Sequence, residues 1–310
     1  MQVIGVGDAD IDIYLDVDHV PEQDEKVLAH SLSFHPGGMV ANFLVALSRL
    51  GTSCGFHGPI GDDEFGRMTL GHMAANKVDT AGAVIKLGER TYFCVVMLDG
   101  SGEKALVVAP TSCLFPQPDD VSEQWIAQAR HLHTTAANVA TALKATRLAR
   151  QNGLTVSMDI EPSAASQTAP LQPLLAQVDL LFVNQRAAKF LTKTDSLEDG
   201  ARSILAYGPE IVCITMGESG SLVASENTTL RAKAFPVEAV DSTGAGDCFA
   251  AGFVHGFLKG WPISQTATFA SAVGALSVTH RGGRNNLPSL EEVITFMAER
   301  GAELPPQSVE

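Results

Sequence analysis

The residues best suited to chemistry lie in one short segment, Asp241-Ser-Thr-Gly-Ala-Gly-Asp247, which precedes an apolar run compatible with a helix. Small residues allow the backbone to turn tightly and to approach a ligand closely. At the start of a helix, the N–H groups of Gly244, Ala245 and Gly246 and the positive end of the helix dipole form an anion site. Asp247 adds one carboxylate at the edge of this anion site. This pairing suits phosphoryl transfer to a hydroxyl, because the amides can hold phosphate oxygens while Asp247 holds the alcohol.

The elements that must position this segment follow an alternating pattern. From about residue 130 onward, strand-like and helix-like runs alternate, which is typical of a parallel sheet covered by helices on both faces. Strands are expected at 131–135, 155–160, 180–183 and 211–215. A late hairpin is expected at 222–224 and 230–235, and helices at 247–259, 263–279 and 289–299.

The N-terminal half interrupts that pattern with extra strands. A buried strand at 3–6 is followed by alternating apolar and polar residues at 11–17, a further strand-like run at 27–34, and a helix over 40–50. Strands at 91–98 and 104–108 flank Asp99-Gly-Ser-Gly102, a strong hairpin signal. We therefore expect an α/β fold whose central, mostly parallel sheet is flanked by helices, with a small β-sheet over one end.

Composition narrows the class of partner. At 310 residues and 45% hydrophobic content the chain can bury a large core. Its 21 basic and 35 acidic residues give a net charge of −14, which argues against nucleic acid or an anionic membrane as a partner. Five scattered cysteines without a Cys-x-x-Cys pair indicate free thiols. The absence of a signal-like N-terminus and of a long apolar run predicts a cytoplasmic protein.

Three further segments carry polar residues beside glycines. They are Gly7-Asp8-Ala9-Asp10-Ile11-Asp12, His35-Pro-Gly-Gly-Met-Val-Ala-Asn42 and Thr215-Met-Gly-Glu-Ser-Gly220. One carboxylate can accept hydrogen bonds from two adjacent hydroxyls, which suits recognition of a diol. Two carboxylates in one pocket would repel an acidic substrate. Gly5-Val-Gly7 lacks the third glycine of a dinucleotide site, and the chain has no Gly-x-x-x-x-Gly-Lys-Ser/Thr sequence, so a P-loop enzyme is excluded.

In their order along the chain, these segments resemble the motifs of the ribokinase (PfkB-type) carbohydrate kinase family. The resemblance implies one ribokinase-like α/β domain over 1–310 and a lid formed by about 11–35 and 90–109. The proline-rich composition of the C-terminal end separately predicts a disordered tail at about 303–310. It implies an ATP-dependent kinase that phosphorylates a hydroxyl of a sugar or sugar-like polyol. Asp247 would be the catalytic base and 244–246 the anion hole. The acceptor would be bound by Asp10, Asp12, Gly38 and Asn42. The nucleotide would be bound by Asn184, Thr215, Gly217, Gly220 and Ser271.

The resemblance also implies metal cofactors, with one departure. Many relatives carry Asn-x-x-Glu, an element linked to magnesium and phosphate, where this chain has Asn184-Gln-Arg-Ala187. Mg²⁺ would then rely on water, ATP oxygens and another carboxylate such as Asp159, since magnesium needs few protein ligands. A K⁺ site is implied between the Asp241 segment and the loop Arg281-Gly-Gly-Arg284. That loop borders the cation or the nucleotide, or is a solvated basic turn.

Two other functions stay open at this point. A nucleoside kinase would use the same diol contacts, with Tyr14, Phe34, Tyr92 and Phe93 covering a base or packing the lid. A catalytically silent nucleotide- or sugar-binding regulator is the other alternative. Lid strands in this family often pair between subunits, so a homodimer through the lid is expected. Because a helix N-terminus favours an ionised carboxylate, we also expect Asp247 to be a weak base.

Overall fold

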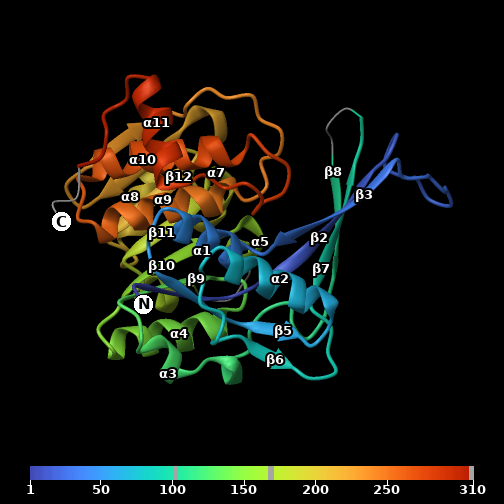
Figure 1. The fold of residues 1–310 in the computed structure, drawn as a ribbon. Coiled ribbons are helices and arrows are strands. Elements are labelled where there is room, and N and C mark those ends of the chain that lie inside the picture. Colours follow the sequence, from blue (N-terminus) through green and yellow to red (C-terminus); the bar gives the residue numbers. More distant parts are fainter. Residues whose placement is uncertain (101–103, 167–170, 307–310) are drawn as a thin grey trace.

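An eight-stranded sheet forms the centre of the molecule (Figure 1), in a computed structural model that describes residues 1–100, 104–166 and 171–306. Its strand order is β14-β13-β12-β11-β10-β9-β1-β4. The strands are β1 (Val3–Val6), β4 (Cys54–His57), β9 (His131–Thr135), β10 (Thr155–Ile160), β11 (Leu180–Asn184), β12 (Ile211–Thr215), β13 (Ser221–Ser225) and β14 (Thr229–Ala232). The pairs among β12, β11, β10, β9, β1 and β4 are parallel, and β13 and β14 are antiparallel.

Helices cover both faces of this sheet because the buried strands are apolar on both sides. In β12, Cys213 packs into one hydrophobic cluster and Val212 and Ile214 into the other. The first cluster receives α1 (Met39–Arg49), α9 (Ala245–Leu258), α10 (Ile263–Ser277) and α11 (Leu290–Glu299). The second receives α4 (Val139–Gln151), α7 (Gln185–Thr192) and α8 (Leu197–Leu205), together with the short helices α3 (Glu123–Ile126), α5 (Pro162–Ala165) and α6 (Gln172–Leu175). The predicted α/β fold class is confirmed.

A second, four-stranded sheet projects from one side of the body (Figure 1). Its order is β3-β2-β7-β8, built from β2 (Asp10–Asp16), β3 (Ser31–Gly37), β7 (Phe93–Leu98) and β8 (Lys104–Ala109). Between this sheet and the body lie α2 (Glu64–Ala75) and the paired strands β5 (Pro59–Gly61) and β6 (Val84–Lys86). The small sheet is called the lid sheet below.

Most predicted elements have the observed type, and the differences lie at their ends. The strand expected at 27–34 is β3, which begins later and runs through Pro36 and Gly37. Proline and glycine normally end strands, but here Gly37 pairs with Asp10 of β2. β14 ends at Ala232 rather than at residue 235. Of the predicted hairpin turn, 101–103 lie outside the described residues, as do 307–310 of the predicted tail.

The structure also describes the cysteines and the helix lengths. All five cysteines are free and buried, which agrees with the absence of a disulfide framework in the sequence. In the described part of the chain, no helix is long and apolar enough to cross a bilayer.

Candidate active site

The candidate site lies where the parallel strands end. β12, β11, β10, β9 and β1 are neighbours, so their carboxyl ends meet at one edge of the sheet. Asp159 lies near the end of β10, Thr215 ends β12, and Asp8 follows β1 shortly after its last residue. The start of α9 brings in the segment that the sequence singled out.

The start of α9 has the backbone geometry of an anion site. Gly244 caps the helix with φ of 77°, a left-handed conformation that favours glycine. The first helical bond runs from the N–H of Cys248 to the carbonyl of Gly244 at 2.9 Å. The N–H of Ala245 donates to Ser242 at 3.3 Å, whereas the N–H of Gly246 has no backbone partner within the described part of the chain. The N–H groups of Gly244 and Asp247 likewise have no backbone partner among the described residues, so the open amides of the anion site come from Gly244, Gly246 and Asp247.

Asp247 is buried beside this anion site. The side-chain amide of Asn42, on α1, donates to its Oδ2 at 2.9 Å, which joins two segments that the sequence predicted to share a site. Burial raises the pKa of Asp247 well above its usual range, the charge of Asp159 raises it further, and only the Asn42 bond opposes them. The prediction that the helix terminus makes Asp247 a weak base is therefore wrong, because the pKa of Asp247 is raised and not lowered. Burial and neighbouring charge outweigh the helix terminus.

Two acidic residues act on Asp247: Asp159, which the sequence analysis named as a possible magnesium ligand, and Glu161, which it did not name. Burial, followed by the charge of Glu161, raises the pKa of Asp159 to about 7. Burial and the charge of Asp8 raise the pKa of Glu161. A sequence signal for Glu161 was available, because it directly follows the predicted strand 155–160 that carries Asp159. Among the described residues, no group of three or more His, Cys, Asp or Glu side chains has the geometry of a complete metal cage.

The predicted acceptor residues gather around the first residues of the lid sheet. A Cβ atom on Gly37 would lie 2.3 Å from Oδ1 of Asp10 and 2.6 Å from Oδ2 of Asp12, so both carboxylates pack closely against the backbone of Gly37. Gly38 follows with φ of 97° and caps α1. Asp10 is 4% exposed and Asp12 8%. The two side chains and the glycine pair thus form one wall beside Asn42.

Asp8, which the sequence analysis left out, anchors that wall. Its carboxylate accepts the backbone N–H groups of Met39 (3.0 Å) and Val40 (3.3 Å) at the start of α1. It also accepts the hydroxyl of Tyr92 at 3.1 Å. Helix N-terminal amides stabilise a negative charge. Asp8 therefore fixes α1, and with it Asn42, against β1 and β7.

The predicted nucleotide residues line one cavity of about 620 Å³, with the exception of Asn184. Thr215, Gly217 and Gly220 form one side, and Ser271 lies on α10. Ala245 and Gly246 border the same cavity, so the anion site opens into it. The Ser271 hydroxyl donates to the carbonyl of Ala267 at 2.9 Å. The remaining lining is largely apolar and includes Phe235, Val237, Phe249 and Val278.

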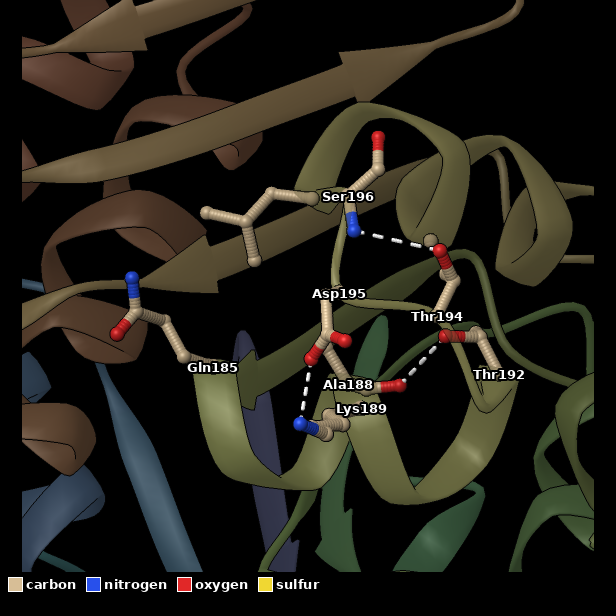
Figure 2. Close-up of a pocket in the computed structure, with 9 residues that line it drawn as sticks. Gln185, Ala188, Lys189, Thr192, Thr194, Asp195 and Ser196 are labelled. Carbon is tan, nitrogen blue, oxygen red and sulfur yellow. Dashed lines mark hydrogen bonds and ion pairs between the residues drawn. The ribbon is translucent and has the colours of Figure 1, made fainter.

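Asn184 has a structural partner and does not line that cavity. Its Oδ1 accepts the N–H of Ala187 at 2.9 Å and caps α7, while Ala187 is fully buried. A separate hollow of about 250 Å³ lies between α7 and the start of α8 (Figure 2). Gln185 borders it, opposite an ion pair between Lys189 and Asp195. None of the predicted site residues lines this hollow.

Asp241 is held by several donors. Its Oδ1 accepts the N–H (3.0 Å) and the hydroxyl (2.7 Å) of Thr243. Its Oδ2 accepts the Tyr14 hydroxyl and the Gly282 N–H, both at 2.9 Å. Burial disfavours the charge, but these bonds lower the pKa of Asp241 to about 2. The segment is thereby tied to the lid sheet and to the loop after α10.

That loop is neither a solvated turn nor a border of the nucleotide cavity. Arg281 pairs with Asp16 of β2 at 2.9 Å. Arg284 is 1% exposed, and its Nη2 donates to the Thr69 hydroxyl of α2 at 2.6 Å. The negative charges of Asp10 and Asp12 in the acidic wall act on it. The sequence showed two arginines, but only the tertiary structure separates the partly exposed Arg281 from the buried Arg284.

Replacing Gly244 with alanine is expected to destabilise the protein by about 2 kcal/mol, because positive φ strains a residue with a Cβ. That Cβ would also lie 2.6 Å from the carbonyl oxygen of Gly283. Gly246→Ala in the same turn is the control, since its Cβ would meet no protein atom within 4 Å. Thermal unfolding of both variants without ligand tests this. Equal melting temperatures would contradict the strain at Gly244.

Comparison with known proteins places this site in a family. The model of the pfkB family of carbohydrate kinases matches residues 2–290. The chain therefore belongs to the pfkB family, and its enzyme class is ATP-dependent carbohydrate kinase.

Individual relatives agree with this assignment over nearly the whole chain. The ATP-dependent ribose-1-phosphate kinase of Halopiger xanaduensis is 30% identical, over 97% of this chain and 99% of its own length. The fructokinase of Salmonella typhimurium is 31% identical, over 88% of this chain and 93% of its own. The structure of Arabidopsis thaliana ribokinase complexed with ribose and ATP has a TM-score of 0.85 at 22% identity, covering 96% of this chain and 98% of that one. At that identity it supports the fold alone, which is ribokinase-like.

Proposed function

We propose that this enzyme transfers the γ-phosphoryl group of ATP to a hydroxyl of an uncharged sugar or sugar-like polyol, with Asp247 as the catalytic base. The observation that carries this proposal is the 2.9 Å hydrogen bond from Asn42 to Asp247. It joins the wall of acceptor residues to the loop whose amides open into the large cavity. An acceptor hydroxyl on the wall and a phosphate at Gly246 would thus meet at one carboxylate.

In the proposed reaction, Asp247 orients the acceptor hydroxyl and takes its proton, while the amide of Gly246 stabilises charge on the transferring group. The transition state of phosphoryl transfer is loose, so little proton transfer is needed early. The raised pKa of Asp247 makes it a better proton acceptor late in the reaction. A positive charge beside Asp247 would favour its ionised form and so oppose the effects of burial and of the neighbouring carboxylates.

The acidic pair Asp159 and Glu161 fits a divalent cation. Their carboxylates repel each other and Asp247, so a cation would relieve the repulsion. Magnesium needs only one or two protein carboxylates beside water and phosphate oxygens, so an incomplete cage suffices. When bound with ATP, Mg²⁺ would neutralise phosphate charge. We infer that Asp159 takes the place of the acidic residue absent at Ala187, which is buried and cannot contribute.

Potassium has less support from the side chains. The Asp241 carboxylate accepts hydrogen bonds from Tyr14, Thr243 and Gly282, so a monovalent cation would have to use backbone oxygens nearby. We therefore propose that K⁺ activates the enzyme at the Asp241 segment by binding to these backbone oxygens. Omitting K⁺ from the assay tests it directly.

The acceptor is proposed to be uncharged because the wall is acidic. Asp8, Asp10 and Asp12 outnumber the single buried cation Arg284 there, so a sugar phosphate would meet repulsion. This favours a free sugar, as the name of the fructokinase relative suggests, over ribose 1-phosphate. Two of the four aromatic residues considered for covering a nucleoside base are already engaged, because Tyr14 donates to Asp241 and Tyr92 to Asp8.

A homodimer through the lid sheet is a further proposal. Large apolar side chains on its edge strands β3 and β8 are exposed, namely Leu32, Phe34, Leu106, Val107 and Val108. Pairing with a second copy would cover them. Sedimentation velocity checks this, and a monomer at micromolar concentration would contradict it.

ADP release across a substrate panel tests the function. With ATP, Mg²⁺ and K⁺ present, we expect a free pentose, hexose or polyol to give the highest kcat/KM, and the corresponding sugar phosphates to react at least about 10-fold less well, because each buried like charge costs more than 1 kcal/mol. A nucleoside as best acceptor would favour a nucleoside kinase. Tight binding of a sugar without ADP release would favour a silent regulator.

A further inference from the structure

Arg284 is a buried cation that the proposed reaction does not use. It lies in the loop after α10 and is 1% exposed. One of its nitrogens donates to Thr69, while Nε and Nη1 are buried and have no hydrogen-bond partner in the described part of the chain. A buried charge with unfilled donors is costly unless opposite charge lies nearby. The surroundings of Arg284 therefore matter.

Those surroundings are the acceptor wall. The charges acting on Arg284 are, in order of strength, those of Asp10, Asp12 and Asp8, followed by Tyr92. Oδ1 of Asp10 is itself buried and without a hydrogen-bond partner in the structure. The Arg284 guanidinium and the Asp10 carboxylate therefore interact electrostatically, and each has buried hydrogen-bonding capacity that no described residue fills.

The loop backbone fixes Arg284 relative to the catalytic segment. The Gly282 N–H donates to Asp241 at 2.9 Å, and the Asn285 amide contacts His35 of β3. Gly283 packs against Gly244, where an added Cβ would lie 2.6 Å from the Gly283 oxygen. The backbone of the loop is therefore held between the lid sheet and the anion site, while the guanidinium reaches Thr69 of α2.

We propose that Arg284 is a positioning residue that sets acceptor affinity. Its guanidinium offsets the repulsion between Asp10 and Asp12 and holds their carboxylates toward the hydroxyls of an uncharged acceptor. This inference rests on the proposed kinase function and deepens its acceptor site. Because Arg284 is almost fully buried, it acts through Asp10 and not by touching the acceptor.

Electrostatics agree with this geometry. Burial raises the pKa of Asp10 well above its usual range, Asp12 and Asp8 raise it further, and Tyr92 and Arg284 lower it. Burial lowers the pKa of Arg284 to about 10, against the opposing charges of Asp10, Asp12 and Asp8. Arg284 therefore stays protonated at neutral pH, and it is the one cation among the groups that act on Asp10.

Arg284→Met, which keeps the length of the side chain but removes its charge, is the first test. With the best acceptor from the panel, we expect the acceptor KM to rise about 10-fold or more, kcat to change less than about 3-fold, and the KM for ATP to stay unchanged. Arg284→Lys keeps the charge and should recover most of the acceptor affinity. Arg49→Met removes a half-buried arginine from the far end of α1 as the control, and should leave the acceptor KM unchanged.

A double-mutant cycle separates positioning from general damage. If Arg284 acts through Asp10, Arg284→Met should raise the acceptor KM less than about 3-fold in an Asp10→Asn background. The inference would be overturned if the two substitutions multiplied each other's effects on the acceptor KM. A fall in kcat at constant acceptor KM, or a raised KM for ATP, would also overturn it. Should Arg284→Met fail to fold, Arg284→Gln also removes the charge and gives the same comparison in both backgrounds, and equal KM increases in the two backgrounds would overturn the inference. A wild-type enzyme that phosphorylates no acceptor would instead refute the proposed function.

Discussion

Asp247→Asn is expected to lower kcat by roughly 10²-fold or more, which is the usual loss when a general base or its alignment is removed. The substitution keeps the shape of the side chain beside Asn42, but removes the proton acceptor. ATP affinity should be retained, because the amides at Gly244 and Gly246 are untouched. Steady-state kinetics with the best acceptor, together with calorimetric titration of ATP, measure both quantities.

Asp179→Asn is the matched control for removing a buried carboxylate. Asp179 lies at the amino end of β11, where it accepts hydrogen bonds from Arg150 and from the N–H of Val156, both at 2.6 Å. Its replacement should lower stability and leave kcat near the wild-type value. Near-native turnover of Asp247→Asn with ATP binding intact would show that Asp247 is not the base.

Asp159→Asn is expected to stabilise the ligand-free protein while lowering its activity. The pKa of Asp159 is raised to about 7 by burial and by Glu161, so the folded state binds its proton more tightly than the unfolded state. The stability this contributes is fully present below the unfolded value near 4 and is lost as the pH rises through about 7. At pH 8 the ionised carboxylate therefore costs stability, on the order of 4 kcal/mol, and asparagine removes that cost.

Thermal unfolding at several pH values and kinetics against Mg²⁺ concentration measure the two effects. The melting temperature of Asp159→Asn should exceed that of the wild type by a few degrees at pH 8, and the difference should vanish near pH 4. The Mg²⁺ concentration needed for half-maximal rate should rise about 10-fold or more, because a carboxylate ligand is lost. Unchanged magnesium dependence would place the metal elsewhere, and a loss of stability at pH 8 would show that the acidic cluster is not repulsive.

The hydrophobic pattern was sufficient to predict the fold class, because the strands and the helices each showed their own regular pattern of apolar residues. The buried strands β11 and β12 are short, mostly apolar runs, and the helices that follow β9 to β11 carry an apolar stripe. The exceptions were local. β3 runs through Pro36 and Gly37, residues that break strands when judged alone, and pairing with β2 across the lid overrides that preference.

The sequence by itself also identified those residues of the candidate site whose type follows from the backbone conformation that they adopt. Gly244 and Gly38 have positive φ in the structure, and the motif around each could be read from residue type and order. The roles of Asn42 and of the glycines in the nucleotide loop were instead implied by the resemblance of their motifs to the family, and these roles stay predictions. Positions such as Gly244 and Gly38 are readable because few residues other than glycine tolerate the required conformation.

Only the tertiary structure decided the charge of the site. The pKa of Asp247 is raised rather than lowered because Asp159 and Asp8, distant in sequence, lie near it in a buried pocket. Arg284 is a buried partner of the acidic wall, whereas Arg281 of the same loop is partly exposed and paired with Asp16. Burial and long-range Coulomb interactions depend on distances between segments that are far apart along the chain, and no local sequence pattern encodes those distances.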